Sequence, residues 1–150
     1  MQNAKIPMEK ELAITNSIEE LTKLPSFVED VCDTLGWGPE KVFNLNLVLE
    51  EALSNVVLYA YPEGEQHNIY LSAYTTSDDL VLQIKDTGKP FDPTQVPDVD
   101  TSLSAEERQI GGLGVFLIKQ IMDKVEYQRQ DGQNILTLTT PLTIDTNNPQ

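Results

Sequence analysis

The sequence has little cysteine, few basic residues and no long apolar run. Cys32 is the one cysteine among 150 residues, so no intrachain disulfide can form and zinc-ligand pairs are absent. No apolar run approaches the roughly 20 residues that span a membrane. Met1 to Lys10 carries no apolar segment of the signal-peptide kind. We therefore expect a cytoplasmic protein with no membrane partner.

Positive charge is also scarce. Ten Lys and Arg residues face 24 Asp and Glu residues, which gives a net charge of −14. Such a surface repels the phosphates of nucleic acids and anionic membranes, so neither is an expected partner. It also repels free nucleotide, so a phosphate site here must depend on backbone amides, a metal ion or a few local cations. The acid excess suits a basic protein partner, or serves solubility alone.

The apolar residues, 39% of the chain, recur with helical and strand periods, which predicts one folded domain. Helices are expected from Asn16 or Ser17 to Gly36 (with Pro25 bending or splitting it), from Pro39 to Ala60, and from Leu113 to Met122. Strands are expected at Glu11 to Ile14, His67 to Tyr74, Leu80 to Asp86, Val125 to Arg129 and Asn134 to Leu138.

Most of these strands are linked as hairpins. The sequence therefore predicts an α+β fold, a two-layer α/β sandwich with three helices on one face of a mixed, mainly antiparallel sheet. We divide the chain into an N-terminal segment (1–9), the domain itself (10–141) and a polar tail (142–150).

The helix expected from Pro39 to Ala60 carries an unusual polar pair. At ~100° per residue, its apolar positions fall on one arc, formed by Val42, Leu45, Leu49, Ala52, Leu53, Val56 and Ala60. Glu51 and Asn55 lie one turn apart and nearly opposite that arc. Because Leu47 and Leu58 border them, the pair resembles the wall of a pocket. Taken alone, it is more typical of an ordinary exposed helix.

Two glycine-bearing segments have a similar double interpretation. Asp86-Thr87-Gly88 follows an expected strand, where it forms either a common turn or a site that accepts a ligand amino group. Gly111-Gly112-Leu113-Gly114 stands at the start of an expected helix, and Arg108 precedes it. Exposed amides and the helix dipole favour phosphate there, although such a segment also serves as a hinge.

The order and spacing of these segments resemble the GHKL (Bergerat-fold) ATPase and kinase superfamily. The similarity is closest to the bacterial anti-sigma-factor serine/threonine kinases and covers about residues 10 to 140. It rests on three segments: Glu51 to Tyr61, Asp86 to Pro93 and Gly111 to Ile118. It implies an ATP-dependent kinase that phosphorylates an anti-anti-sigma antagonist and sequesters a sigma factor, and it allows a homodimer.

The resemblance also implies a role for each polar residue of the first two segments. Glu51 is expected to be the general base, and Asn55 to hold the Mg²⁺ that bridges the phosphates. Asp86 is expected to bind the adenine amino group, with Gly88 beside it.

The glycine-rich segment has an implied role as well. Gly111, Gly112, Leu113 and Gly114 are expected to bind the phosphates, with Arg108 as a further phosphate contact. Residues 92 to 110 are expected to form a lid.

Two departures from the family pattern support an alternative function. Tyr59 stands where these kinases often have histidine, and the lid is acidic, with Asp92, Asp98, Asp100, Glu106 and Glu107. The alternative is a regulator that binds ATP and sequesters a protein without transferring phosphate. A third interpretation is an interaction domain without nucleotide. His67, the one histidine, is expected to be a surface residue.

Overall fold

The computed structural model describes residues 8–95 and 112–142. The elements are β1 (Glu9–Thr15), a 3₁₀ helix η1 (Ile18–Lys23), α1 (Leu24–Leu35), α2 (Pro39–Tyr59), β2 (Asn68–Thr75), β3 (Asp79–Asp86), a short η2 (Pro93–Gln95), α3 (Gly112–Ile121), β4 (Lys124–Gln130) and β5 (Gln133–Pro141). Arg108, Gly111 and most of the expected lid lie outside the described residues.

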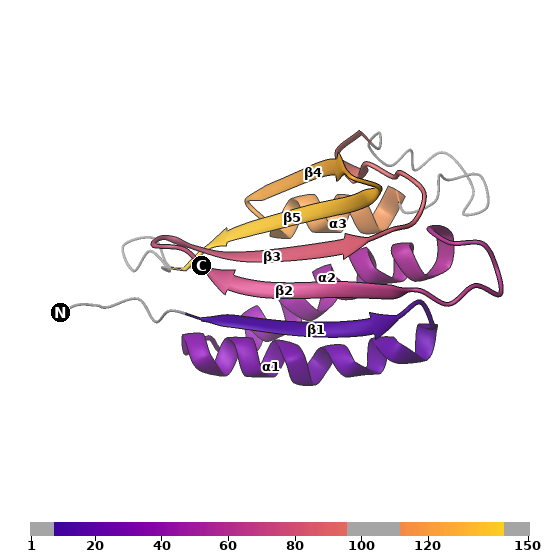
Figure 1. The fold of residues 1–150 in the computed structure, drawn as a ribbon. Coiled ribbons are helices and arrows are strands. Elements are labelled where there is room, and N and C mark those ends of the chain that lie inside the picture. Colours follow the sequence, from indigo (N-terminus) through magenta and orange to yellow (C-terminus); the bar gives the residue numbers. More distant parts are fainter. Residues whose placement is uncertain (1–7, 96–111, 143–150) are drawn as a thin grey trace.

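The strands form a five-stranded sheet in the order β1-β2-β3-β5-β4, and its four pairings are all antiparallel. The three α-helices lie on one face of this sheet (Figure 1). The predicted α+β sandwich is therefore confirmed, with antiparallel pairing throughout the described strands.

The core lies between this face of the sheet and α1 and α2. Antiparallel register aligns Leu71 of β2 with Ile84 of β3, and Ile84 with Leu136 of β5. From α2, the side chains of Leu45, Val48, Leu49 and Leu53 are buried against these strands. Val48 was missing from the predicted arc because it lies at the edge of the helical stripe, yet it is fully buried.

The start of the first helical segment differs from one expectation. Ser17 is the N-cap residue of η1, but its hydroxyl donates to the Glu19 carboxylate instead of capping the backbone, and Asn16 bonds to the loop before β2. Its amide nitrogen donates to Glu65 O at 2.8 Å, and its oxygen accepts from His67 N at 2.8 Å. The predicted split near Pro25 is confirmed, because Pro25 stands in the first turn of α1, where it needs no hydrogen-bonded N–H.

Cys32 lies on the inner side of α1 and is fully buried. Desolvation is the main cause that raises the pKa of its thiol to about 11, with a smaller contribution from Asp33. The thiol is therefore uncharged at neutral pH and packs as a small apolar side chain. Among the described helices, none is both long and apolar enough to cross a bilayer.

Candidate functional site

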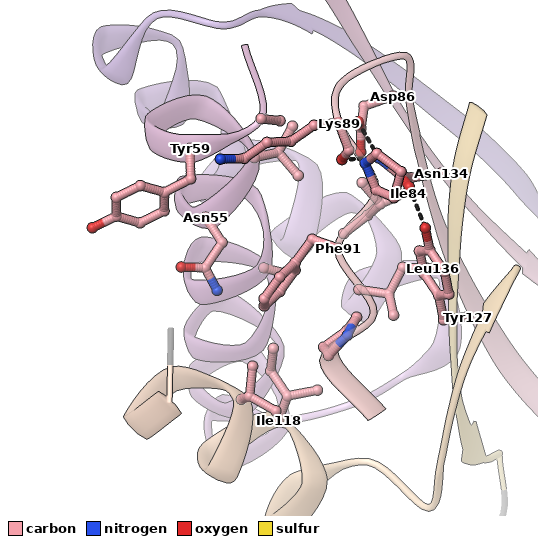
Figure 2. Close-up of a pocket in the computed structure, with 16 residues that line it drawn as sticks. Asn55, Tyr59, Ile84, Asp86, Lys89, Phe91, Ile118, Tyr127, Asn134 and Leu136 are labelled. Carbon is pink, nitrogen blue, oxygen red and sulfur yellow. Dashed lines mark hydrogen bonds between the residues drawn. The ribbon is translucent and has the colours of Figure 1, made fainter. Parts of the chain in front are cut away.

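A pocket opens between the C-terminal half of α2, the end of β3, α3 and the strands β4 and β5 (Figure 2). Apolar side chains form most of its wall, and a few polar groups from different elements meet in it. The lining residues are Ala52, Asn55, Val56, Tyr59, Ala60, Ile84, Asp86, Lys89, Pro90, Phe91, Pro93, Val115, Ile118, Tyr127, Asn134 and Leu136. An apolar pocket with few convergent polar groups is the usual form of a small-molecule site.

Asp86 is the buried acid of this pocket. It is the last residue of β3, and only 4% of it is exposed. Its Oδ1 accepts two hydrogen bonds, from Gly88 N at 2.8 Å and from Asn134 Nδ2 at 2.9 Å. Its Oδ2 has no hydrogen bond to the described residues. Because buried polar atoms are normally paired, this oxygen is suited to accept a hydrogen bond from a ligand.

The turn after Asp86 packs directly on the end of α2. Lys89 N donates to Ala60 O at 2.9 Å, and Tyr61 Oη accepts from Thr87 N at 2.8 Å. A Cβ at Gly88 would lie 2.5 Å from the Cβ of Ala60 and 2.6 Å from its carbonyl oxygen. Gly88 therefore allows the turn after β3 to approach the end of α2. Gly88 itself does not line the pocket.

The predicted polar pair on α2 is divided between two positions. Asn55 lines the pocket, and Figure 2 shows it on α2 across the pocket from Asp86 and Asn134. Glu51 is half-buried at the edge, where it meets the first turn of α3. A Cβ at Gly114 would meet Glu51 Oε2, so a larger residue at this position would require the carboxylate to move. The structure thus brings Glu51, Asn55 and Gly114 to one side of the site.

The rest of the glycine-rich segment is described only in part. Gly112 and Leu113 belong to the first turn of α3, which places their backbone at a helix N-terminus near Glu51. Arg108 and Gly111, the other expected phosphate contacts, lie outside the described residues.

Three further residues bear on the two departures from the family pattern. Tyr59 does line the pocket, at its rim, with 40% of it exposed. Asp92, one of the acidic lid residues, is half-buried and accepts hydrogen bonds from Thr94 N at 2.8 Å and Thr94 Oγ1 at 2.6 Å. Lys89, which the sequence analysis did not select, is the one cation among the lining residues that the structure describes.

His67 is not part of this pocket. Its ring stacks on Tyr61 with centroids 4.2 Å apart, and Nε2 lies 2.9 Å from Glu65 Oε1. The expectation was a surface residue, and the side chain is partly exposed.

Besides Lys89, the residues missed by sequence reasoning lie on the last hairpin. Asn134 of β5 is buried, and it bonds to Asp86, Tyr127 and Arg129. A signal was available, because Asn134 precedes Leu136 and Leu138 at a period of two, which places an amide on the inner face of a strand.

The donors present are compatible with a bound Mg²⁺. In the described part of the chain, no three His, Cys, Asp or Glu side chains gather into a metal-binding group. Mg²⁺ in nucleotide sites is commonly held by one or two protein oxygens together with phosphates and water. The amide oxygen of Asn55 has no protein hydrogen bond among the described residues and is suited to be such a ligand.

Comparisons with known proteins find relatives of one kind, kinases and kinase-like ATPase domains. The histidine kinase-like ATPase domain family matches residues 14–140. Serine/threonine-protein kinase BtrW of Bordetella bronchiseptica is 38% identical over 104 residues, which cover 69% of this chain and 73% of that protein. Serine-protein kinase RsbW of Halalkalibacterium halodurans is 31% identical over 116 residues, which cover 75% of this chain and 70% of that protein.

A solved structure shares the fold. The RsbU and RsbW domains of a Mycobacterium tuberculosis protein match with a TM-score of 0.59 and 13% identity. The match covers 87% of this chain and 32% of that longer chain, so this chain spans about a third of its length. With the family match over most of the sequence and two kinases above 30% identity, the chain belongs to the histidine kinase-like ATPase domain family.

Proposed function

We propose that this chain is an ATP-dependent serine/threonine protein kinase that phosphorylates an anti-anti-sigma antagonist and sequesters a sigma factor. One observation carries the nucleotide part: Asp86 is buried in an apolar pocket, and one of its oxygens has no hydrogen-bond partner among the described residues. The kinase part is supported by two relatives whose names are those of serine or serine/threonine kinases.

The residues suit the stages of this reaction. Asp86 Oδ2 accepts a hydrogen bond from the adenine amino group while the apolar wall covers the base. The phosphates extend toward the first turn of α3, where free backbone N–H groups and the helix dipole favour anions. The amide oxygen of Asn55 would hold Mg²⁺, which neutralises charge on the phosphates when bound. Lys89 is a further candidate cation for the nucleotide.

Glu51 is the proposed general base. Its carboxylate has no ion pair or hydrogen bond with the described residues, and it lies against Gly114 at the phosphate end of the site. It would take the proton from a serine or threonine hydroxyl of the antagonist as that oxygen attacks the γ-phosphorus. The bond to the β-phosphate oxygen breaks, and ADP leaves.

Phosphotransfer is the direct test of this proposal. Incubating the chain with Mg·ATP and an antagonist encoded beside it should yield phosphoserine or phosphothreonine on the antagonist, detected by mass spectrometry. If ATP binds but neither the chain nor the antagonist acquires phosphate, the result contradicts the kinase proposal and favours the alternative.

The alternative is a regulator that binds ATP without transferring it. Tyr59 at the pocket rim favours this function, since it replaces the histidine common in the kinases at the position nearest the C-terminal end of α2. Calorimetry would then show ATP binding, while no antagonist would receive phosphate.

A thermal shift separates both functions from a domain without nucleotide. ATP with Mg²⁺ at 100 times its dissociation constant is expected to stabilise the chain by about 2.7 kcal/mol, which for 150 residues raises Tm by roughly 5–11 °C. GTP at the same concentration is the control and should raise Tm less, because guanine presents a carbonyl where adenine presents an amino group. An unchanged Tm with ATP would exclude a nucleotide site of this affinity.

Several further parts of the proposal rest on the family pattern. They are a cytoplasmic location, Mg²⁺ as the metal and a domain at residues 10–141. A homodimer is also proposed, because β1 is an edge strand that pairs only with β2 among the described strands, and such edges can extend a sheet.

A further inference from the structure

Asn134 lies at the centre of a hydrogen-bond network beneath the proposed nucleotide site. Register places it on β5 opposite Asp86 of β3 on one side and Arg129 of β4 on the other. The tight turn at Asp131 and Gly132, both with positive φ (53° and 79°), fixes the β4–β5 register. Three strands therefore contribute side chains to one row at the pocket end of the sheet.

The amide nitrogen of Asn134 donates toward β3 and its following turn. It lies 2.9 Å from Asp86 Oδ1 and 2.9 Å from Lys89 O, with a longer contact of 3.4 Å to Gly88 O. Both strong contacts are to oxygens that can only accept, once Asp86 is ionised. One –NH₂ group thus connects the acid and the backbone turn that follows it.

The amide oxygen of Asn134 faces two donors on β4. Arg129 Nη1 lies 3.1 Å from it, and the hydroxyl of Tyr127 donates to it (Figure 2 shows the tyrosine contact). A guanidinium has no acceptor atom, so the atom that faces Arg129 must be the oxygen. The amide therefore has one allowed orientation, and a flipped amide would place its oxygen against Asp86 and Lys89 O.

This arrangement gives the two carboxyl oxygens of Asp86 different roles. Gly88 N and Asn134 Nδ2 both donate to Oδ1, which fixes the plane of the carboxyl and leaves Oδ2 for the ligand. A carboxyl without these two donors would rotate and offer a less defined acceptor. Arg129 Nη1 also donates to Gly88 O at 2.6 Å, so the same network holds the turn.

We infer that Asn134 is a positioning residue for base recognition: Tyr127 and Arg129 orient its amide, and the amide holds Asp86 so that Oδ2 accepts from the 6-amino group of adenine. This rests on the proposed ATP site and adds the group that sets its preference for an amino-bearing purine. Asn134 acts through Asp86 and does not take part in the transfer of phosphate.

The test compares two nucleotides that differ only in the amino group. Dissociation constants of ATP and of purine riboside triphosphate, which lacks the 6-amino group, are measured by calorimetry with Mg²⁺. The wild-type chain should bind ATP about ten to a hundred times more tightly, as expected for one hydrogen bond to a charged acceptor. In Asn134→Leu this ratio should fall to within about threefold, mainly through weaker ATP binding.

Two more variants keep the test valid if Asn134→Leu folds poorly. Tyr127→Phe removes one of the two donors that orient the amide, and should lower the ratio by about threefold with little effect on the analogue. Thr137→Val is the matched control. Thr137 lies on β5 like Asn134 but on the outer face of the sheet, and the variant removes its hydrogen bond with Gln83 of β3 (3.2 Å). It should leave the ratio unchanged.

The outcomes separate this inference from the proposed function. If the variants weaken both nucleotides by the same factor, Asn134 has only a structural role and the inference is wrong while ATP binding stands. Equal affinity of the wild-type chain for both nucleotides would also overturn it. If the wild-type chain binds neither nucleotide, the proposed function fails and the inference fails with it.

Discussion

Replacing Glu51 with glutamine is expected to slow phosphotransfer by about 10²- to 10⁴-fold, the usual contribution of a general base. Glutamine keeps the size of the side chain, so it still fits against Gly114, but it cannot take a proton from the attacking hydroxyl. Affinity for ATP should change by less than about threefold, because Asp86 and the apolar wall bind the base at the other end of the pocket. The measurement is the initial rate of antagonist phosphorylation at saturating Mg·ATP, with calorimetry for ATP affinity.

Glu50→Gln provides the matched control. Glu50 is the neighbouring acid on α2, is exposed, and does not line the pocket. This variant loses the same charge from the same helix and should retain the full rate. An equal rate for Glu51→Gln and the wild-type chain would show that another group accepts the proton.

Replacing Gly88 with alanine is expected to give the largest loss of stability and of ATP affinity together. The new Cβ would meet the Cβ and the carbonyl oxygen of Ala60 at 2.5 and 2.6 Å. Because both atoms are held by the backbone of Ala60, the C-cap residue of α2, no side-chain rotation relieves the contact, and the turn must move away from α2. That movement breaks the Lys89 N to Ala60 O bond and displaces the carboxyl of Asp86.

Overpacking of this kind costs about 1–3 kcal/mol, which corresponds to a fall in Tm of roughly 2–12 °C for a chain of this length. ATP affinity should fall by about tenfold or more, since the acceptor oxygen is displaced. Thermal unfolding and calorimetry measure the two effects. The matched control is Gly38→Ala, where a Cβ has no neighbour within 4 Å and φ is −92°. Because Gly38 is the N-cap residue of α2, this variant should lose some stability but keep its ATP affinity. A similar loss of ATP affinity in both variants would mean that the approach to Ala60 is not the cause.

Much of the fold was predictable because the polar and apolar periodicity of each helix or strand is visible within its own segment of sequence. Alternation of polar and apolar residues placed β2 and β3 within one residue at each predicted end, and Asp131-Gly132 marked the last turn. The long apolar stripe, Pro39 and the Tyr61-Pro62 stop likewise bounded α2. Assignments based on a single polar residue were less reliable: Asn16 bonds to the loop before β2, at a sequence distance that no local pattern reveals.

The candidate site was predictable to the extent that it lies on single elements. Glu51 and Asn55 share a helix face, and Asp86 ends a strand, so all three could be selected from the sequence. The contact between Asp86 and Asn134 depends on the pairing of β3 with β5, which are separated by α3 and β4. Hairpin patterns predict neighbours along the chain, so they indicate β4 with β5 but not this pairing.

The buried thiol of Cys32 has a practical consequence for experiments on this protein. With its pKa at about 11 and its side chain inside the core, it should be inert to maleimide and iodoacetamide reagents while the chain is folded. The native sequence is therefore already a suitable background for site-specific labelling. A cysteine introduced at an exposed site such as Glu50 can carry a fluorophore without first replacing Cys32, and slow labelling of Cys32 itself would report opening of the core between α1 and the sheet.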